Sequence, residues 1–205
     1  MSLLPVGQAH DDPDSEPFDL FERLKDGTAE IHKQTEKLVP VFRQGFNRED
    51  YAHLLELFYG FWAPAEALLT QVTGLEDPDL ALGSRLKSSL LCVDLIKLGR
   101  DPAKVRQCPN LPVLDDFLKG LGCLYVLEGS TLGSRYIARH LAEALDLRED
   151  SGAAFFNAYG ASVAKRWSEF KGFVTRRTEP EHVHVVVFAA RQTFTCFHDW
   201  LGAAT

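Results

Sequence analysis

The sequence predicts an all-α protein, a single multi-helix domain, from three observations. Apolar residues recur at three- and four-residue steps over long stretches, which is the spacing of one helix face. Helix-start signals, in which Asn, Asp or Thr is followed by acidic residues or proline, precede several of these stretches. No segment alternates polar and apolar residues between turns. The valines at 185–187 are the only local strand signal, and the length of the segment around them favours a helix.

The first two helices are expected over residues 18–38 and from Asn47 to about Gly74. The first has one apolar face and stops before Pro40; its face is formed by Phe21, Leu24, Thr28, Ile31, Thr35 and Leu38. Asn47 can cap the second helix, with Glu49 and Asp50 in its first turn, and Gly74 can close it.

The later helices are expected at four places, with a short helical turn between the first two of them. Asp77-Pro78 pairs a cap with a proline at the first helical position, and it predicts a helix to about Leu98. Asp101-Pro102 repeats this signal for the short turn. The others are predicted from near Pro112 through Tyr125, over 151–177, and from the capping box Thr178–Glu181 to about Leu201.

Composition and charge restrict the function classes. The chain has 205 residues, 45% of them hydrophobic, so it can bury a globular core. A net charge of −7 disfavours nucleic-acid binding, which needs a basic face. The longest nearly apolar stretch, residues 183–190, is far short of the roughly 20 residues of a membrane span. We expect a flexible tail over 1–16, one domain over 17–205, no secretory signal and a cytoplasmic location.

The segment 121–141, LGCLYVLEGSTLGSRYIARHL, breaks a local rule. Gly129, Ser130, Thr131 and Gly133 interrupt good helix sequence, and each weakens a helix interior by up to about 1 kcal/mol relative to alanine. Such breaks tend to mark functional sites, because a glycine backbone can approach a flat ligand closely and lets the helix kink. A tight helix crossing or a loop between two helices explains the same residues, so both interpretations stay open.

The first predicted helix carries a second candidate, the pair His32 and Glu36. Side chains four residues apart are neighbours on a helix surface. A histidine that binds a metal through one ring nitrogen needs an acceptor at the other nitrogen, and Glu36 can be that acceptor. A surface His–Glu pair without function has the same spacing.

Together these two segments resemble the heme oxygenase family. Leu24, Lys25, Thr28, His32 and Glu36 match its first-helix pattern LKxxTxxxHxxxE, and LYVLEGSTLGS (124–134) is similar to its kinked distal helix. YAHLLELFYGFWAPAEALL (51–69) and ARQTFTCFHDWL (190–201) resemble its second and last helices. The resemblance covers residues 18–202 and is nearest to the bacterial, phytochrome-associated branch.

The resemblance implies a reaction and a cofactor. Family members open heme to biliverdin, carbon monoxide and ferrous iron, using O2 and electrons from a ferredoxin or an NAD(P)H reductase system. Heme is then both substrate and cofactor. An electron-donor protein and a bacteriophytochrome that receives biliverdin are the implied protein partners.

The resemblance also implies roles for individual residues. His32 matches the iron ligand, with Glu36 beside it, and Gly129, Ser130 and Gly133 match the distal wall. Phe194 stands where an aromatic packs near the heme, and Lys25 matches a lysine that contacts a propionate. Further cations for the propionates are sought on a later helix, at Lys171, Arg176 and Arg177.

Two positions depart from the family pattern. Animal members carry an aspartate after the first distal glycine, where this chain has Ser130, and Ser134 replaces a second glycine that follows the later one. Both changes affect how a distal water network is built. A serine hydroxyl can still donate and accept hydrogen bonds.

Three other readings remain. The first is a protein of the same fold that binds or senses heme without turnover. The second is a di-iron oxidase that uses the ExxH pair Glu181 and His184. The third is a thiaminase-like enzyme with a cysteine nucleophile; its candidates are Cys92, Cys108, Cys123 and Cys196, none in CxxC spacing.

Overall fold

The structure, a computed structural model, describes residues 19–203 and contains no β-strand in that range. The prediction of an all-α fold is confirmed, whereas the predicted tail over 1–16 lies outside the described residues. The α-helices are α1 (Leu20–Glu36), α2 (Arg48–Leu69), α3 (Ser88–Lys97), α4 (Phe117–Leu145), α5 (Val163–Arg177) and α6 (Val183–Gly202). Short 3-10 helices are η1 (Leu82–Ser84), η2 (Pro102–Lys104), η3 (Phe155–Asn157), η4 (Gly160–Ser162) and η5 (Pro180–His182).

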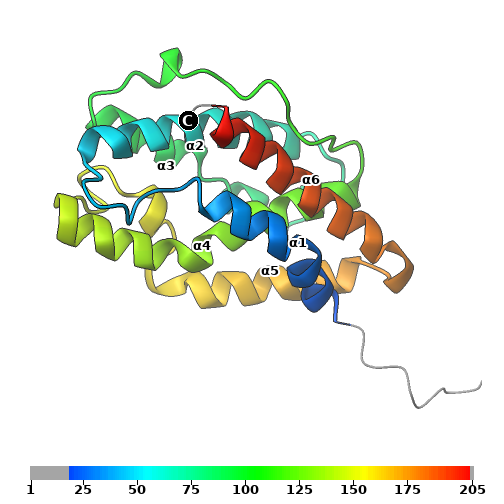
Figure 1. Ribbon diagram of the computed structural model, residues 1–205. Helices are drawn as coiled ribbons and strands as arrows, with labels where there is room; N and C mark the ends of the chain where they lie inside the picture. The colour runs from blue at the N-terminus through cyan, green and yellow to red at the C-terminus, as the bar shows by residue number, and fades with distance from the viewer. Residues whose placement is uncertain (1–18, 204–205) are drawn as a thin grey trace, which may run out of the picture.

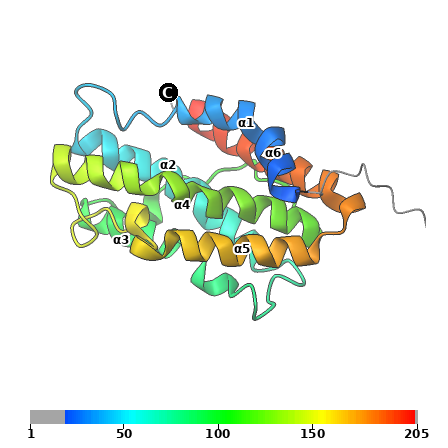
Figure 2. The ribbon, with the colours of Figure 1, turned by 90° about the horizontal axis from the view of Figure 1, so that it is seen from below.

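The longest helix, α4, runs through the middle of the molecule (Figure 1). Figure 2 shows α1 and α6 together on one side of α4 and α5 on the other. α6 packs against both α4 and α1, and α2 packs against α3. α6 therefore connects α1 to the central helix α4.

Two helix starts agree with the local signals in the sequence. Asp19 caps α1 by accepting hydrogen bonds from the backbone N–H groups of Phe21 and Glu22. Asn47 caps α2 in a reciprocal capping box, in which the Asp50 side chain accepts from the Asn47 backbone N–H. In both cases the partners lie within three residues, so the signal is local.

The predicted helix from Asp77-Pro78 to about Leu98 is wrong in its first half, because α3 begins only at Ser88. Ala81, with φ of 51°, turns the chain out of the helical conformation before η1. The cap of α3 comes from another helix, since the Glu66 carboxylate of α2 accepts from the backbone N–H groups of Lys87 and Ser88 at 2.7 and 2.9 Å. A cap supplied from so far along the chain leaves no local signal.

Other boundaries also differ from prediction. α2 ends at Leu69 rather than near Gly74. α4 begins at Phe117 rather than near Pro112 and ends at Leu145 rather than near Tyr125, and Asp116 caps its start by accepting from the Lys119 N–H. Only the second part of the region 151–177 forms α5, after η3 and η4. The predicted capping box at Thr178 is wrong: α6 follows η5, and the buried Thr178 hydroxyl has no hydrogen-bond partner among the described residues.

The closest approach of α4 to α6 is at Gly122. A Cβ atom built there would lie 2.5 Å from the Val186 carbonyl oxygen and 2.9 Å from the Ala190 nitrogen. Both are backbone atoms of α6, so neither can move aside as a flexible side chain would. Gly122 is therefore the residue that lets these helices touch.

We expect Gly122→Ala to lower the free energy of unfolding by about 1–3 kcal/mol, the usual penalty for overpacking. Gly133→Ala is the matched control, because a Cβ there meets nothing within 4 Å. In the ligand-free protein the control should gain up to about 1 kcal/mol from helix propensity. Urea unfolding of both variants measures the difference, and a Gly122→Ala variant as stable as wild type would contradict the close crossing.

Candidate functional site

A cavity of about 600 Å³ lies between α1, α4 and α6. Six of the predicted site residues line it together: His32, Glu36, Gly129, Ser130, Gly133 and Phe194. They come from three helices far apart in the sequence. Its size falls in the range of about 300–1,000 Å³ that ligand and cofactor pockets occupy.

One wall of the cavity is α1, which presents Thr28, His32, Thr35 and Glu36. The hydroxyls of Thr28 and Thr35 donate to backbone carbonyls one turn back, at 2.7 Å, so they are satisfied within the helix. The His32 side chain is 54% exposed, and its Nε2 lies 3.4 Å from Glu36 Oε1. Glu36 therefore engages Nε2 and not Nδ1 of this ring.

Phe194 of α6 packs against the His32 ring. The two ring centroids are 5.1 Å apart, with an angle of 42° between the planes. The sequence places these residues 162 positions apart, and the packing of α1 on α6 brings them together. This contact limits the directions in which the imidazole can point.

The opposite wall is α4, and its glycines leave space there. A Cβ at Gly133 would meet nothing within 4 Å, and one at Gly129 would meet only the Trp167 ring, at 3.9 Å. A tight helix crossing is therefore not the reason for these two glycines. The crossing glycine of this helix is Gly122, whereas Gly129 and Gly133 border the cavity.

The hydroxyl side chains of this wall bond back to their own helix. Ser130 Oγ donates to the Leu127 carbonyl at 2.7 Å, Thr131 Oγ1 to that of Glu128, and Ser134 Oγ to that of Ser130. Such bonds tend to bend a helix, yet the segment stays within the single helix Phe117–Leu145. The proton of Ser130 is engaged, so its oxygen faces the site as an acceptor.

Aromatic rings that the sequence analysis did not single out close one end of the cavity. They are Phe58, Trp62, Phe155, Phe156 and Phe197. Phe58 and Trp62 are stacked, with centroids 5.1 Å apart and planes at 8°. The adjacent phenylalanines at 155–156 were the one local signal of this apolar wall.

The buried Asp94 of α3 holds η3 in place. Its two carboxylate oxygens accept from the backbone N–H groups of Ala154 and Phe155, each at 2.8 Å. Burial raises the pKa of this carboxyl, and the two N–H groups oppose that rise. The aromatic end of the cavity thus depends on a contact between residues about 60 positions apart.

Two of the predicted cations, Lys25 and Lys171, do not line the cavity themselves but are connected to it through Phe21. Lys171 Nζ lies 5.8 Å from the centre of the Phe21 ring, and Lys25 follows Phe21 by one helical turn. Phe21 in turn contacts Tyr125 and Trp167, which line the cavity. Both lysine side chains are exposed, so they can turn toward an anionic group near Phe21.

The Arg177 side chain interacts with residues outside the cavity. It forms an ion pair with Asp77 at 3.4 Å and lies over the rings of Phe117 and Phe173, neither of which lines the cavity. Arg176 is exposed and does not line the cavity either. The structure therefore places the Arg177 side chain against residues outside the cavity.

Neither non-heme alternative gains support. The Nδ1 atom of His184 lies 2.7 Å from the backbone carbonyl oxygen of Glu181, and no contact between the two side chains is observed. Among residues 19–203, no three His, Cys, Asp or Glu side chains meet as a metal site. Burial raises the pKa of the Cys108, Cys123 and Cys196 thiols, that of Cys123 to about 12, which disfavours a thiolate nucleophile.

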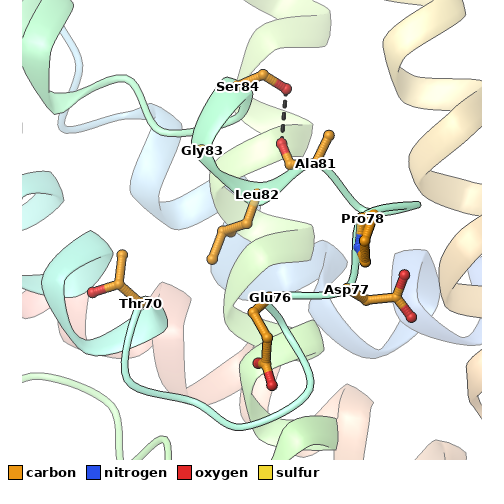
Figure 3. Close-up of a pocket in the computed structure, with 8 residues that line it drawn as sticks. All are labelled: Thr70, Glu76, Asp77, Pro78, Ala81, Leu82, Gly83 and Ser84. Atoms are coloured by element: carbon orange, nitrogen blue, oxygen red, sulfur yellow. Dashed lines mark hydrogen bonds between the residues drawn. The ribbon is translucent and has the colours of Figure 1, made fainter.

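A second cavity, of about 400 Å³, lies between the end of α2 and the segment 76–84 (Figure 3). Its acidic side chains are already engaged. Glu76 accepts from the Gly74 N–H at 2.6 Å, and Asp77 pairs with Arg177. It contains no titratable group left for chemistry on a ligand.

In the described part of the chain, no helix combines the length and apolar character of a membrane span.

Comparison with known proteins identifies the fold. No protein-family model matches this sequence, and no curated protein matches it. Among solved structures, the NO- and CO-bound heme oxygenase from Neisseria meningitidis is similar, with a TM-score of 0.74. The two sequences are 21% identical, and the match covers 91% of this chain and 92% of that one. The chain therefore has the heme oxygenase fold.

Proposed function

We propose that this protein is a heme oxygenase, which binds heme in the cavity between α1 and α4 and opens it to biliverdin, carbon monoxide and ferrous iron. The observation that carries the proposal is the opposition of His32 to a glycine wall with free space in front of it. An imidazole on one side and an open face on the other are what heme chemistry with O2 requires. The shared fold supports the same conclusion.

The residues present fit heme. The cavity is large enough for a cofactor, is mainly apolar, and has aromatic rings at its closed end. Among residues 19–203, His32 is the one histidine that lines it, so these residues offer a single protein ligand to iron. Two exposed lysines are connected to the cavity through Phe21, and the propionates of heme need such cations.

Each residue then has a defined task. His32 would bind the iron through the ring nitrogen that does not face Glu36, and Glu36 would orient the ring and increase its basicity. Gly129 and Gly133 keep side chains out of the space above the macrocycle. Ser130 offers an oxygen lone pair to a water or a donor in that space.

Bound heme supplies the redox chemistry with O2, and the protein orients it and controls access to it. The buried aromatic rings would exclude water from bound heme, and Lys25 and Lys171 would pair with its propionates. Electrons would come from a ferredoxin or an NAD(P)H reductase. A cytoplasmic location and delivery of biliverdin to a bacteriophytochrome belong to the same proposal.

The test is to add hemin to the purified protein and record the absorption spectrum. Ascorbate or a ferredoxin system is then supplied, and the product is identified by chromatography. We expect a Soret band, its loss during turnover, and biliverdin with one equivalent of carbon monoxide. Absence of hemin binding would overturn the proposal.

A heme carrier or sensor of the same fold is the second candidate. One observation favours it: the Ser130 hydroxyl donates its proton to the Leu127 carbonyl, so it does not act as a donor toward a ligand. Stable hemin binding without biliverdin formation, under conditions in which the reductant reduces the iron, would decide for this candidate.

The position of cleavage depends on how heme is rotated in its plane. We expect cleavage at the α-meso carbon, as in enzymes that supply a phytochrome chromophore. Lys25→Ala should alter the ratio of biliverdin isomers more than the rate, because one exposed charge contact contributes about 1 kcal/mol or less. Separation of the isomers from the wild type and the variant measures this.

Lys33 provides the control, because it is also an exposed lysine on α1 but lies more than three helical turns from Phe21, whereas Lys25 lies one turn from it. Lys33→Ala should keep the wild-type isomer ratio. A wild-type product dominated by the β or δ isomer would contradict the α-meso assignment. An unchanged ratio in Lys25→Ala would leave Lys171 as the orienting cation.

A further inference from the structure

Behind the glycine wall, α4 carries a buried carboxylate that the proposed function does not use. Glu128 directly precedes Gly129 and is 1% exposed. One of its oxygens accepts from Arg85 at 2.5 Å, and the other accepts from Lys87 Nζ at 2.5 Å and from the Tyr159 hydroxyl at 2.7 Å. Such charge-assisted bonds have strong directional preferences.

These partners belong to two segments that flank α4. Arg85 and Lys87 lie between η1 and α3, and Tyr159 directly precedes η4. Arg85 also donates to the carbonyl of Arg166, so it connects the first segment to α5, the helix that follows η4. Glu128 is therefore the point at which α4 is attached to both.

The cluster is balanced in charge. Two buried cations, Arg85 and Lys87, face two buried carboxylates, Glu128 and Glu66, and all four side chains are at most 3% exposed. Burial lowers the pKa of Lys87, and Glu128 opposes that shift. Removing one partner leaves a buried charge uncompensated, which costs free energy of folding. The bonds between Glu128 and its partners therefore favour one arrangement of these side chains.

Glu128 and the cavity-lining residues point in different directions from α4. At about 100° per residue, Gly129 and Gly133 lie roughly 100° and 140° around the helix from Glu128. A Cβ atom built at Gly129 would meet one atom, at 3.9 Å, and one built at Gly133 would meet nothing within 4 Å. The two glycines therefore add little packing on the cavity side, whereas the buried bonds of Glu128 hold α4 from another side of the helix.

We infer that Glu128 is a positioning residue: its bonds to Arg85, Lys87 and Tyr159 set the depth and rotation of the Gly129–Gly133 wall over the cavity. The inference rests on the proposed function for what the wall covers, namely bound heme and its sixth ligand. The position of the wall itself is a property of the heme-free protein as well.

The test compares Glu128→Gln and Tyr159→Phe with Glu66→Gln. The first variant removes the charge, and the second removes one hydrogen bond to Glu128 while keeping the ring. Glu66→Gln is the matched control, because it perturbs a carboxylate of the same buried cluster whose bonds go to the α3 backbone rather than hold α4. Urea unfolding is measured for each, so that effects are compared at known stability.

The first readout needs no heme. In the heme-free protein, hydrogen exchange of the amides of residues 129–137 should be about tenfold faster in Tyr159→Phe than in Glu66→Gln, as the loss of one hydrogen bond to a charged group implies. In Glu128→Gln, provided that the variant folds, exchange of the same amides should be faster than in Tyr159→Phe. Equal exchange in Tyr159→Phe and the control would overturn the inference, whatever the protein does with heme.

The second readout uses carbon monoxide as a probe on ferrous heme. The C–O stretching band reports the polarity and the space in front of the wall. We expect the band to shift or split in Tyr159→Phe and to keep the wild-type frequency in Glu66→Gln. A wild-type band in Tyr159→Phe would also overturn the inference, whereas failure of the wild type to bind hemin would overturn the proposed function alone.

Discussion

Replacing His32 with alanine should abolish heme turnover while leaving the fold intact. The side chain is 54% exposed, so its removal should change the free energy of unfolding by no more than about 0.5 kcal/mol. Loss of an outer-shell partner alone typically costs 10- to 100-fold, so loss of the ligand itself should lower turnover by at least about 100-fold. The hemin absorption spectrum and the rate of biliverdin formation measure both effects.

His53 provides a matched control for this variant. It is a similarly exposed histidine on a helix, 57% exposed, with a carboxylate at the same 3.4 Å distance, but it does not line the cavity between α1 and α4. His53→Ala should retain the spectrum and the rate. A His32→Ala protein with the wild-type hemin spectrum and full activity would show that this histidine is not the iron ligand.

Gly133→Phe should block the site without unfolding the protein. No heavy atom lies within 4 Å of a Cβ at this position, so the new ring has room to extend into the cavity. There it occupies the space proposed for heme. Overpacking costs of about 1–3 kcal/mol correspond to hemin binding that is roughly 10- to 100-fold weaker. Titration with hemin measures the change, and circular dichroism checks the fold.

Gly83→Phe is the control for adding an exposed ring, because a Cβ at Gly83 also meets nothing within 4 Å and Gly83 lies outside this cavity. It should bind hemin as the wild type does. Hemin affinity and turnover at wild-type levels in Gly133→Phe would place the heme elsewhere, and the assignment of the α4 wall would then be wrong.

Local signals in the sequence were sufficient where the interacting residues are neighbours along the chain. The spacing of apolar residues predicted the helices, and Asn47 with Asp50 predicted the start of α2. The pair His32 and Glu36 was predicted to be adjacent, and their side chains are 3.4 Å apart. The resemblance of the glycine segment 129–133 to a distal helix anticipated the fold that the structural comparison identifies.

Local signals failed where a partner comes from elsewhere in the chain. The start of α3 was misplaced because its cap, Glu66, lies on α2. The ion pair between Arg177 and Asp77, one hundred positions earlier, also had no signal in the sequence. The aromatic end of the cavity was not predicted at all, since it depends on Asp94 holding η3.

The sequence by itself determined the all-α class, the apolar faces of the helices and the candidate functional groups. These groups are an imidazole beside a carboxylate and a helical segment that contains glycines. Only the tertiary structure decided between the two meanings of those glycines. Gly122 meets the backbone of α6, whereas Gly129 and Gly133 border a cavity that also contains His32. The physical reason is the sequence separation of the residues that interact. Helix formation depends on residues three or four apart, but whether a glycine faces a neighbouring helix or an open space depends on the packing of helices that are distant in sequence.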